Sequence, residues 1–182
     1  MLNKYVYALV MLIIMAAWFA KGPVSVPKPA IKDANQSPPL AEIKSDLNSA
    51  DMKPDATEVI GKCNIEFIND VAMNVNAHDV VKNSLLKLTG WAMDDQHERL
   101  PEKVIVRFTN SANKHFYAIA RTGLKRNDVR DYFRLSDRVL GAGFDLHLNT
   151  RDLPAGIYSL TLLIQFDRKT YVCDNNRKIN MM

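Results

Sequence analysis

The chain of 182 residues is 47% hydrophobic and 24% charged, and its formal net charge is +4. That length holds one domain with appendages, and most of the composition is that of ordinary globular material. The net charge is too small to indicate a nucleic-acid-binding protein, so no nucleic-acid partner is expected.

The N-terminus contains an uncharged apolar run at residues 5–20. A helix of this length spans about 24 Å, which is short for a membrane span and long for the core of a signal peptide. Signal peptidase needs small residues one and three positions before its cut, and a cut after Ala20 places bulky Trp18 third. A cut two residues further on is blocked by Pro23. We therefore predict an uncleaved membrane anchor over residues 1–21, with a cleaved signal peptide or a buried core helix as the alternatives.

Residues 22–60 have the composition of a linker. They contain six of the eight prolines and no aromatic residue, and their charges alternate in sign. Such a segment buries too little apolar surface to offset its conformational entropy. We expect a flexible spacer that holds a domain away from a membrane surface.

The folded region is organised around the stretch Ser84–Asp95, which reads as a buried strand followed by an acidic turn. Strand alternation places four apolar or small residues on one face, namely Leu86, Leu88, Gly90 and Ala92. Trp91 lies on the opposite face among polar residues. Because glycine inside a strand indicates a bulge or a close backbone approach, we expect one of these at Gly90.

Further strands are expected along the rest of the chain. They lie at 65–68, 84–92, 103–109, 114–121, 142–149, 157–166 and 170–174, with an edge strand at 177–181. Short strands joined by frequent turns are typical of an antiparallel β-sandwich. The sequence therefore predicts an all-β, immunoglobulin-like antiparallel β-sandwich over residues 61–182.

One segment, residues 126–140, interrupts the strands with helical spacing, and we expect one short inserted helix there. Four arginines recur along it at four-residue steps: Arg126, Arg130, Arg134 and Arg138. Asp128 and Asp137 offset part of their charge. The row predicts either a solvated helix face with local ion pairs or a surface that binds phosphate or carboxylate groups.

The two cysteines, Cys63 and Cys173, lie near the two ends of the folded region. Neither belongs to a metal-ligand spacing such as CxxC, so no metal site is expected. In an exported domain they would form a disulfide that ties the first strand to the last, and two free thiols are the alternative.

The sequence contains no catalytic motif that we can identify. The four histidines have no metal-binding spacing, and neither GxSxG nor a phosphate-binding glycine loop occurs. Asp94 and Asp95 are adjacent on an expected turn, where they point in different directions and form no acid–base pair. His147 is expected to be solvated on the polar face of a strand. We therefore predict no enzyme and no cofactor.

Several short motifs follow one another in a fixed order. They are CNIEFIN from Cys63, GWAMD from Gly90, Arg121 followed by RNDV from Arg126, AGF from Ala142, LPAGIY from Leu153 and CD from Cys173. Together they resemble a poorly characterised bacterial β-sandwich module with a GWAxD…RPDV…GF…LPxGxY signature. That module occurs in envelope proteins, in some cases beside glycosyltransferases or other surface-polysaccharide enzymes.

The resemblance covers about residues 60–182 and implies a sandwich fold and an envelope location. It supplies no catalytic residue, so none is assigned from it. Asn127 stands where the pattern more often has proline, so the turn there is expected to differ.

These features predict a non-catalytic accessory or recognition module, anchored in the inner membrane with its domain in the periplasm. Trp91 is either a sugar-stacking platform or a tryptophan half-buried under a loop. Arg121 and the arginine row are candidates for binding an anionic envelope glycan or a membrane-protein partner. The alternatives are an enzyme of envelope polysaccharide metabolism, a structural subunit of a membrane complex, and a protein released after signal cleavage.

Overall fold

The computed structural model describes residues 38–45, 61–73 and 77–182. The apolar run at residues 5–20 and much of the expected linker lie outside these ranges. Within them, no helix is long and apolar enough to cross a membrane.

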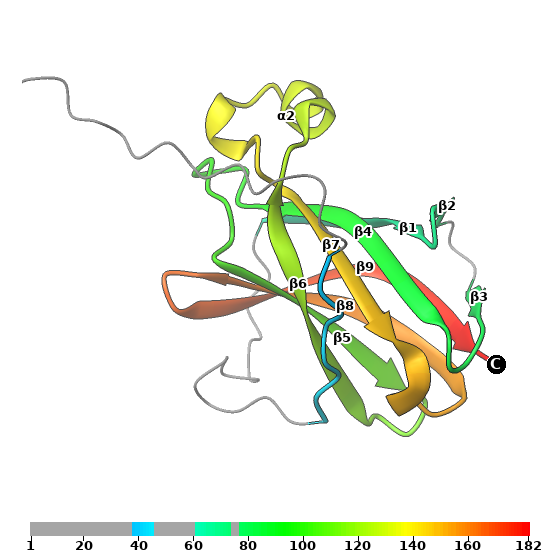
Figure 1. Cartoon of the computed structure of the whole chain (residues 1–182). Helices are drawn as coiled ribbons and strands as arrows, with labels where there is room; N and C mark the ends of the chain where they lie inside the picture. The colour runs from blue at the N-terminus through cyan, green and yellow to red at the C-terminus, as the bar shows by residue number, and fades with distance from the viewer. Residues whose placement is uncertain (1–37, 46–60, 74–76) are drawn as a thin grey trace, which may run out of the picture. The chain divides into compact units, whose positions relative to one another are not determined.

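The described part of the chain is mostly β-structure with one α-helix (Figure 1). Its strands are β1 (Lys62–Ile68), β2 (Val71–Ala72), β3 (His78–Val80), β4 (Leu85–Met93), β5 (Lys103–Asn110), β6 (His115–Leu124), β7 (Gly143–Asn149), β8 (Gly156–Phe166) and β9 (Lys169–Met181). The helix α2 spans Asn127–Phe133, and two 3-10 turns, η1 and η2, span Asp137–Val139 and Thr150–Asp152. The all-β prediction is therefore confirmed.

The strands form one sheet in the order β2-β1-β4-β7-β6-β5-β8-β9-β3. All neighbouring pairs are antiparallel except β3 and β9. The sheet curls because β6 changes partner along its length. Its residues 115–120 pair with β5, whereas its last residues, from Arg121 to Leu124, pair with β7.

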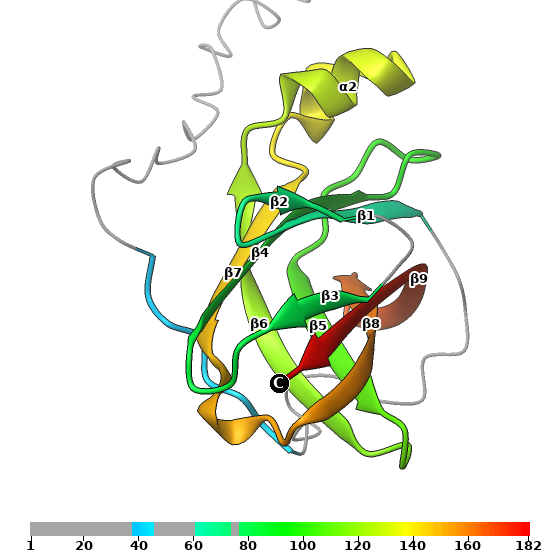
Figure 2. The same ribbon diagram turned by 90° about the vertical axis from the view of Figure 1, so that its right-hand side faces the viewer.

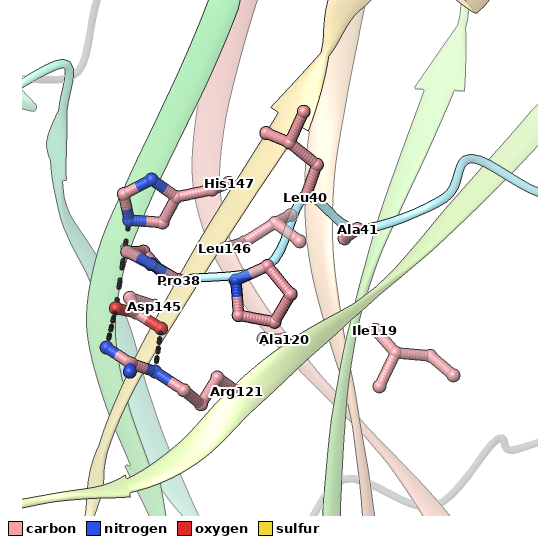
Figure 3. A pocket seen from close by; sticks show the side chains of 10 residues that line it. Pro38, Leu40, Ala41, Ile119, Ala120, Arg121, Asp145, Leu146 and His147 are labelled. Atoms are coloured by element: carbon pink, nitrogen blue, oxygen red, sulfur yellow. Dashed lines mark hydrogen bonds and ion pairs between the residues drawn. The ribbon is translucent and has the colours of Figure 1, made fainter. Parts of the chain in front are cut away.

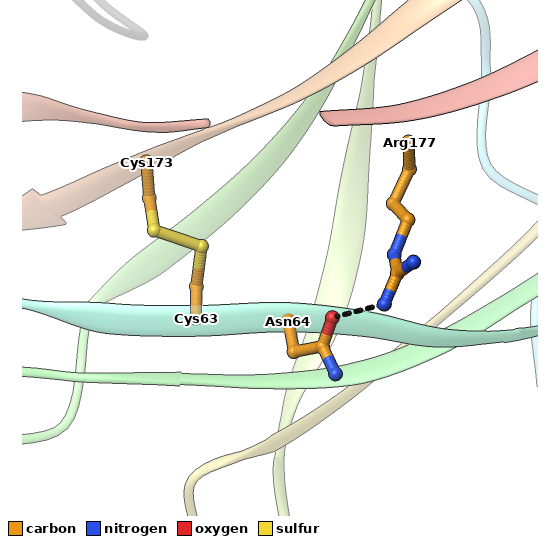
Figure 4. Close-up of a disulfide and its surroundings, with 4 residues drawn as sticks. All are labelled: Cys63, Asn64, Cys173 and Arg177. Carbon is orange, nitrogen blue, oxygen red and sulfur yellow. Dashed lines mark hydrogen bonds between the residues drawn. A yellow bond between two sulfur atoms is a disulfide. The ribbon is translucent and has the colours of Figure 1, made fainter. Parts of the chain in front are cut away.

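The curl brings β1 close to β9, and a disulfide joins them (Figure 4). The bond links Cys63 to Cys173, whose Cα atoms are 6.4 Å apart. Beside it, Arg177 on β9 donates a hydrogen bond to the Asn64 side chain over 3.2 Å. The predicted bridge between the first and last strands of the folded region is confirmed.

The core lies inside the curl and follows the predicted alternation of β4. Leu86, Leu88 and Ala92 are fully buried, and Trp91 on the other face is half-buried. Burying one leucine side chain in this way stabilises the fold by about 1.5–3 kcal/mol. The neighbouring strand β7 and the strands β5 and β8 add the inward rows that the sequence indicated, including Phe108, Phe144, Leu146, Leu160 and Leu162.

Gly90 lies at a close approach between two strands, as its position in β4 predicted. A Cβ atom there would overlap the carbonyl oxygen of Asn64 and lie 2.8 Å from the Phe144 ring. The facing strand β1 has a register shift between Ile65 and Phe67, which leaves Phe67 partly exposed. The expected bulge is therefore in the partner strand.

Two short strands, β2 and β3, were not predicted. They lie at opposite ends of the sheet order, β2 beside β1 and β3 beside β9. The turns around them use left-handed backbone conformations at Asn69, Asp70 and Asn83, which leave no regular hydrophobic period to detect. The expected edge strand at 177–181 is instead the end of β9.

The predicted helix over residues 126–140 is shorter in the structure. Arg134 has a left-handed conformation with φ of 56°, and the chain reverses there. The Leu135 amide donates to the Arg130 carbonyl, a helix-ending bond that turns Leu135 back toward the apolar cluster under α2. The four arginines therefore do not line one helix face.

Residues 38–45, predicted to belong to the flexible linker, are docked on the domain, and we call them the strap. The Ala41 amide donates to the His147 carbonyl over 2.6 Å, and Lys44 and Tyr117 exchange two backbone hydrogen bonds of 2.9 Å. Ala41 and Ile43 pack against the core. The apolar contacts of Ala41 and Ile43 offset the conformational entropy that ordering this segment costs, although its composition is that of a linker.

Candidate functional site

Residues 125–142, which we call the α2 excursion, project beyond the ends of β6 and β7 (Figures 1 and 2). A small apolar cluster attaches the excursion to β4. Its buried members are Met93, Val129, Val139 and Ala142, and Trp91, Leu100, Phe133 and Leu135 pack around them. The excursion is therefore a packed part of the domain, held by a cluster that it shares with β4.

Trp91 is a half-buried member of this cluster. Its indole N–H donates to Glu66 over 3.0 Å, and the Phe133 ring packs edge-on with its centroid 5.4 Å away. This packing corresponds to the half-buried tryptophan that the sequence offered as one alternative. A sugar-stacking role for Trp91 stays a prediction.

Arg126 forms two ion pairs inside the domain. It contacts Asp128 at 2.6 Å and Glu66 at 2.7 Å, and its side chain is only 20% exposed. Hydrogen bonding to Asp128, followed by hydrogen bonding to Glu66, raises the pKa of Arg126 above its ordinary value. Because Glu66 also accepts from Trp91, it joins two of the predicted site residues.

Arg130 is also paired internally. Its guanidinium contacts Asp131 at 2.7 Å and Asp137 at 2.6 Å. Hydrogen bonds to Asp131 first, and to Asp137 next, raise the pKa of Arg130 above its ordinary value. Two of the four arginines in the row are thus neutralised by neighbouring carboxylates.

The other two arginines, Arg134 and Arg138, are exposed, as are Lys125 and Tyr132. Lys125, Arg134 and Arg138 make no ion pair with a described residue. The Tyr132 side chain beside them is 80% exposed. We call Lys125, Tyr132, Arg134 and Arg138 the basic surface. The nearby carboxylate of Glu98 accepts instead from the Ser136 hydroxyl.

Arg121 lies on β6, outside the α2 excursion, and has a different environment. Its guanidinium binds the Asp145 carboxylate with two hydrogen bonds of 2.9 and 2.6 Å (Figure 3). Hydrogen bonding to Asp145 raises the pKa of Arg121 above its ordinary value. The structure therefore does not join Arg121 to the basic surface.

Asp145 is buried, and the His147 side chain is only 14% exposed, with Nε2 3.7 Å from the carboxylate. The prediction that His147 is solvated was wrong, because the strap covers this part of β7. Sequence reasoning missed Asp145 as the partner of Arg121. Their contact depends on the pairing register of β6 and β7, which no local pattern reveals.

Asp94 is fully buried at the turn after β4. It accepts hydrogen bonds from the backbone of Gln96 and His97 and from the Arg99 guanidinium. Arg99 also reaches Asp167 in the β8–β9 turn. Asp94 therefore has the turn-forming role that the sequence indicated.

Among the residues that the structure describes, no group of three His, Cys, Asp or Glu side chains is arranged to hold a metal ion. Comparison of the chain with protein-family models, with curated proteins and with solved structures found no match. The fold and the site define a disulfide-closed β-domain with an exposed basic and aromatic surface.

Proposed function

We propose that the chain is a non-catalytic recognition module of the bacterial envelope and that it binds an anionic glycan at the basic surface. The supporting observation is the unequal pairing of the arginines. Arg126 and Arg130 bind carboxylates of the domain itself, whereas Arg134 and Arg138 are exposed without such partners among the described residues.

The residue types at the basic surface suit an acidic sugar. Guanidinium groups bind carboxylates and phosphates through two parallel hydrogen bonds. An exposed aromatic face such as that of Tyr132 packs against the apolar face of a sugar ring. A surface of this kind needs no catalytic group, because it holds its ligand without changing it.

We further place the domain in the periplasm, with residues 1–21 as a single inner-membrane anchor. Export is supported by the bond between Cys63 and Cys173, since disulfides persist in oxidising compartments. The anchor is supported by the apolar run and by the absence of a suitable cleavage sequence. An exported protein whose N-terminus begins after residue 20 would identify the run as a signal peptide.

The curled sheet supports an immunoglobulin-like sandwich as the finer description of the fold. β1, β4 and β7 are one set of neighbours and β5, β8 and β9 another, which corresponds to the two sheets of that architecture. At the start of β8, the buried Tyr158 donates its hydroxyl to the Pro154 carbonyl over 2.7 Å. A tyrosine at this corner is a hallmark of immunoglobulin-like domains. An experimental structure in which the two sets do not pack face to face would contradict this description.

The binding proposal is tested with the full chain in detergent and the double variant Arg134→Ala/Arg138→Ala. Immobilised polygalacturonate is the acidic probe, and neutral dextran is its control. We expect the wild-type chain to bind only the acidic probe and to bind less as salt rises, since salt screens exposed charges. The double variant should bind about fivefold to tenfold more weakly, because each exposed charge pair contributes up to about 1 kcal/mol.

The matched control is Arg151→Ala/Lys178→Ala, which removes the same charge from exposed positions outside the α2 excursion. This control should bind like the wild type. If both double variants lose binding equally, the binding depends on net charge alone. If the Arg134→Ala/Arg138→Ala variant binds like the wild type, the basic surface is not the binding site.

A further inference from the structure

The strap enters the domain at the end that carries the α2 excursion. It runs parallel to β7, with Ala41 paired to Leu148, and β7 begins at Gly143, directly after the excursion. Because the two segments run in the same direction, the residues before Ala41 lie toward the start of β7. Pro38 accordingly lines the same cavity as Asp145 (Figure 3). The chain therefore joins the domain beside the excursion and not at the opposite end.

The docked strap also shortens the segment that leads to the domain. Residues 22–60, predicted as one spacer, would reach up to about 130 Å when fully extended. Once residues 38–45 are docked, residues 22–37 are left, and these reach at most about 55 Å. We call residues 22–37 the tether. A shorter tether raises the effective concentration of groups near its attachment point at the surface that holds its far end.

The excursion presents an excess of positive charge at this end of the domain. Residues 125–142 contain five cations and three carboxylates. Those carboxylates bind Arg126 and Arg130, so the excess is provided by the three cations of the basic surface. Anionic lipid headgroups attract lysine and arginine side chains that lie within about 10 Å of the membrane surface.

Tyr132 lies among these cations. Its exposed ring packs edge-on against Phe133, with the two centroids 4.9 Å apart. Tyrosine is enriched where membranes meet water, because its ring is apolar and its hydroxyl is polar. The face of such a ring also packs on a sugar. The basic surface therefore has the residue types that a charged lipid headgroup with sugar rings requires.

We propose that the anionic glycan of the proposed function is the headgroup of an acidic glycolipid in the membrane that anchors the chain. This inference rests on the proposed function, since it uses the same surface and adds the source of the ligand. A soluble polysaccharide reaches every face of the domain equally, so it imposes no position on its binding surface. A lipid headgroup is available at the end where the tether joins the domain, and the excursion with the basic surface is at that end.

The test places the full chain in phosphatidylcholine vesicles that contain one added lipid. The added lipid is a ganglioside with sialic acid, the neutral lactosylceramide, or phosphatidylglycerol, which is anionic but has no sugar ring. Because the two cysteines of the chain form a disulfide, one introduced cysteine takes a single fluorophore. The labelled position is Asn127→Cys at the start of α2, and the control is Ala112→Cys in the turn before β6, at the opposite end.

A quencher carried by the lipid reports how close each label lies to the membrane. We expect the label at residue 127 to be quenched several-fold more than the label at residue 112 in ganglioside vesicles. Quenching should be weaker with phosphatidylglycerol and weakest with lactosylceramide, and it should fall as salt rises. Arg134→Ala/Arg138→Ala should reduce quenching at residue 127 to the level measured with lactosylceramide, whereas Arg151→Ala/Lys178→Ala should leave it unchanged.

The contribution of the strap is tested with Ala41→Pro, which removes the amide that donates to the His147 carbonyl. Release of the strap lengthens the tether to residues 22–60. Effective concentration falls roughly as the −3/2 power of chain length, or about fourfold here, so quenching at residue 127 should fall. Glu42→Pro is the control, since the Glu42 amide makes no hydrogen bond to a described residue, and it should behave like the wild type.

Equal quenching at residues 127 and 112 in ganglioside vesicles would overturn the proposal. Equal quenching in ganglioside and phosphatidylglycerol vesicles would overturn the glycolipid as the ligand. If the chain still binds immobilised polygalacturonate in either case, the proposed function stands and only the lipid source fails. Absence of both quenching and polygalacturonate binding would contradict the proposed function as well.

Discussion

At the scale of single residues, the buried carboxylate of Asp94 connects segments that are distant in the sequence. Asp94 holds the turn after β4 and contacts Arg99, which in turn reaches Asp167. The Arg99 guanidinium also lies over the Phe166 ring, 5.2 Å from its centroid. One carboxylate therefore connects the β4–β5 loop to the β8–β9 hairpin.

Replacing Asp94 by asparagine should destabilise the domain by about 3 kcal/mol, because Arg99 and His97 then lose their buried anionic partner. The cost is not larger because Arg99 is partly exposed and keeps its contact with water. Urea unfolding at pH 7 measures the change. Asp152→Asn is the control, since Asp152 is exposed. A cost for Asp94→Asn no larger than that of the control would show that the network contributes no stability.

The same residue predicts a pH dependence. Burial raises the pKa of Asp94, but hydrogen bonds from Arg99 and His97 outweigh this and hold it below the ordinary value of 3.8. A carboxyl that titrates lower when folded contributes its full stability above about pH 4 and loses it as the pH falls through the folded pKa. The difference in unfolding free energy between wild type and Asp94→Asn should therefore shrink from pH 6 to pH 2. A constant difference would contradict the lowered pKa.

At the scale of elements, close packing between strands explains features that propensity alone does not. Gly90 allows β1 to approach β4, and the register shift in β1 lies at the same place. In the α2 excursion, the helical pattern covers residues 126–140, but the helix itself is shorter. There α2 ends at Phe133, the left-handed Arg134 caps it, and Leu135 packs against the apolar cluster.

Gly90→Ala should destabilise the domain by about 2–4 kcal/mol, because the added methyl group meets the Asn64 carbonyl and the Phe144 ring. Gly123→Ala is the comparison. A Cβ atom at Gly123 meets nothing within 4 Å, but its φ of +87° still costs about 1 kcal/mol. Urea unfolding of both variants should rank Gly90→Ala as the more damaging, and the reverse order would refute the close approach.

At the scale of the whole domain, the short strands β2 and β3 terminate the sheet, and the disulfide joins the strands next to them. The bond between Cys63 and Cys173 spans 110 residues of sequence and joins β1 to β9. Short edge strands leave little backbone for pairing with another chain. The described domain therefore limits strand pairing at the two ends of its sheet, while the strap pairs with the edges of β6 and β7.

Cys173→Ser should lower the unfolding free energy by about 2–5 kcal/mol, because the open chain regains the conformational freedom that a long closed loop removes. Urea unfolding measures the loss, and the wild-type chain treated with reductant should match the variant. Thiol labelling of the unreduced, denatured wild type should find no reactive cysteine. Two labelled thiols would contradict the bridge.

Local sequence patterns were sufficient for the strands that carry a clear alternation. The residues themselves predicted the buried face of β4, a bulge or a close approach at Gly90 and, for an exported domain, the pairing of the two cysteines. Side-chain alternation and the steric demand of a glycine act within a strand or against its immediate neighbour, so a local pattern records them.

The tertiary structure alone decided the distant partners of Arg121 and Arg126 and the docking of the strap. Arg126 meets Glu66 of β1, Arg121 meets Asp145 through the register of β6 and β7, and the strap docks despite its proline-rich context. Each contact depends on how distant strands pair and on where the sheet curls. A single sequence carries no local period for such pairing, because the free energy that selects it comes from burying the whole core at once.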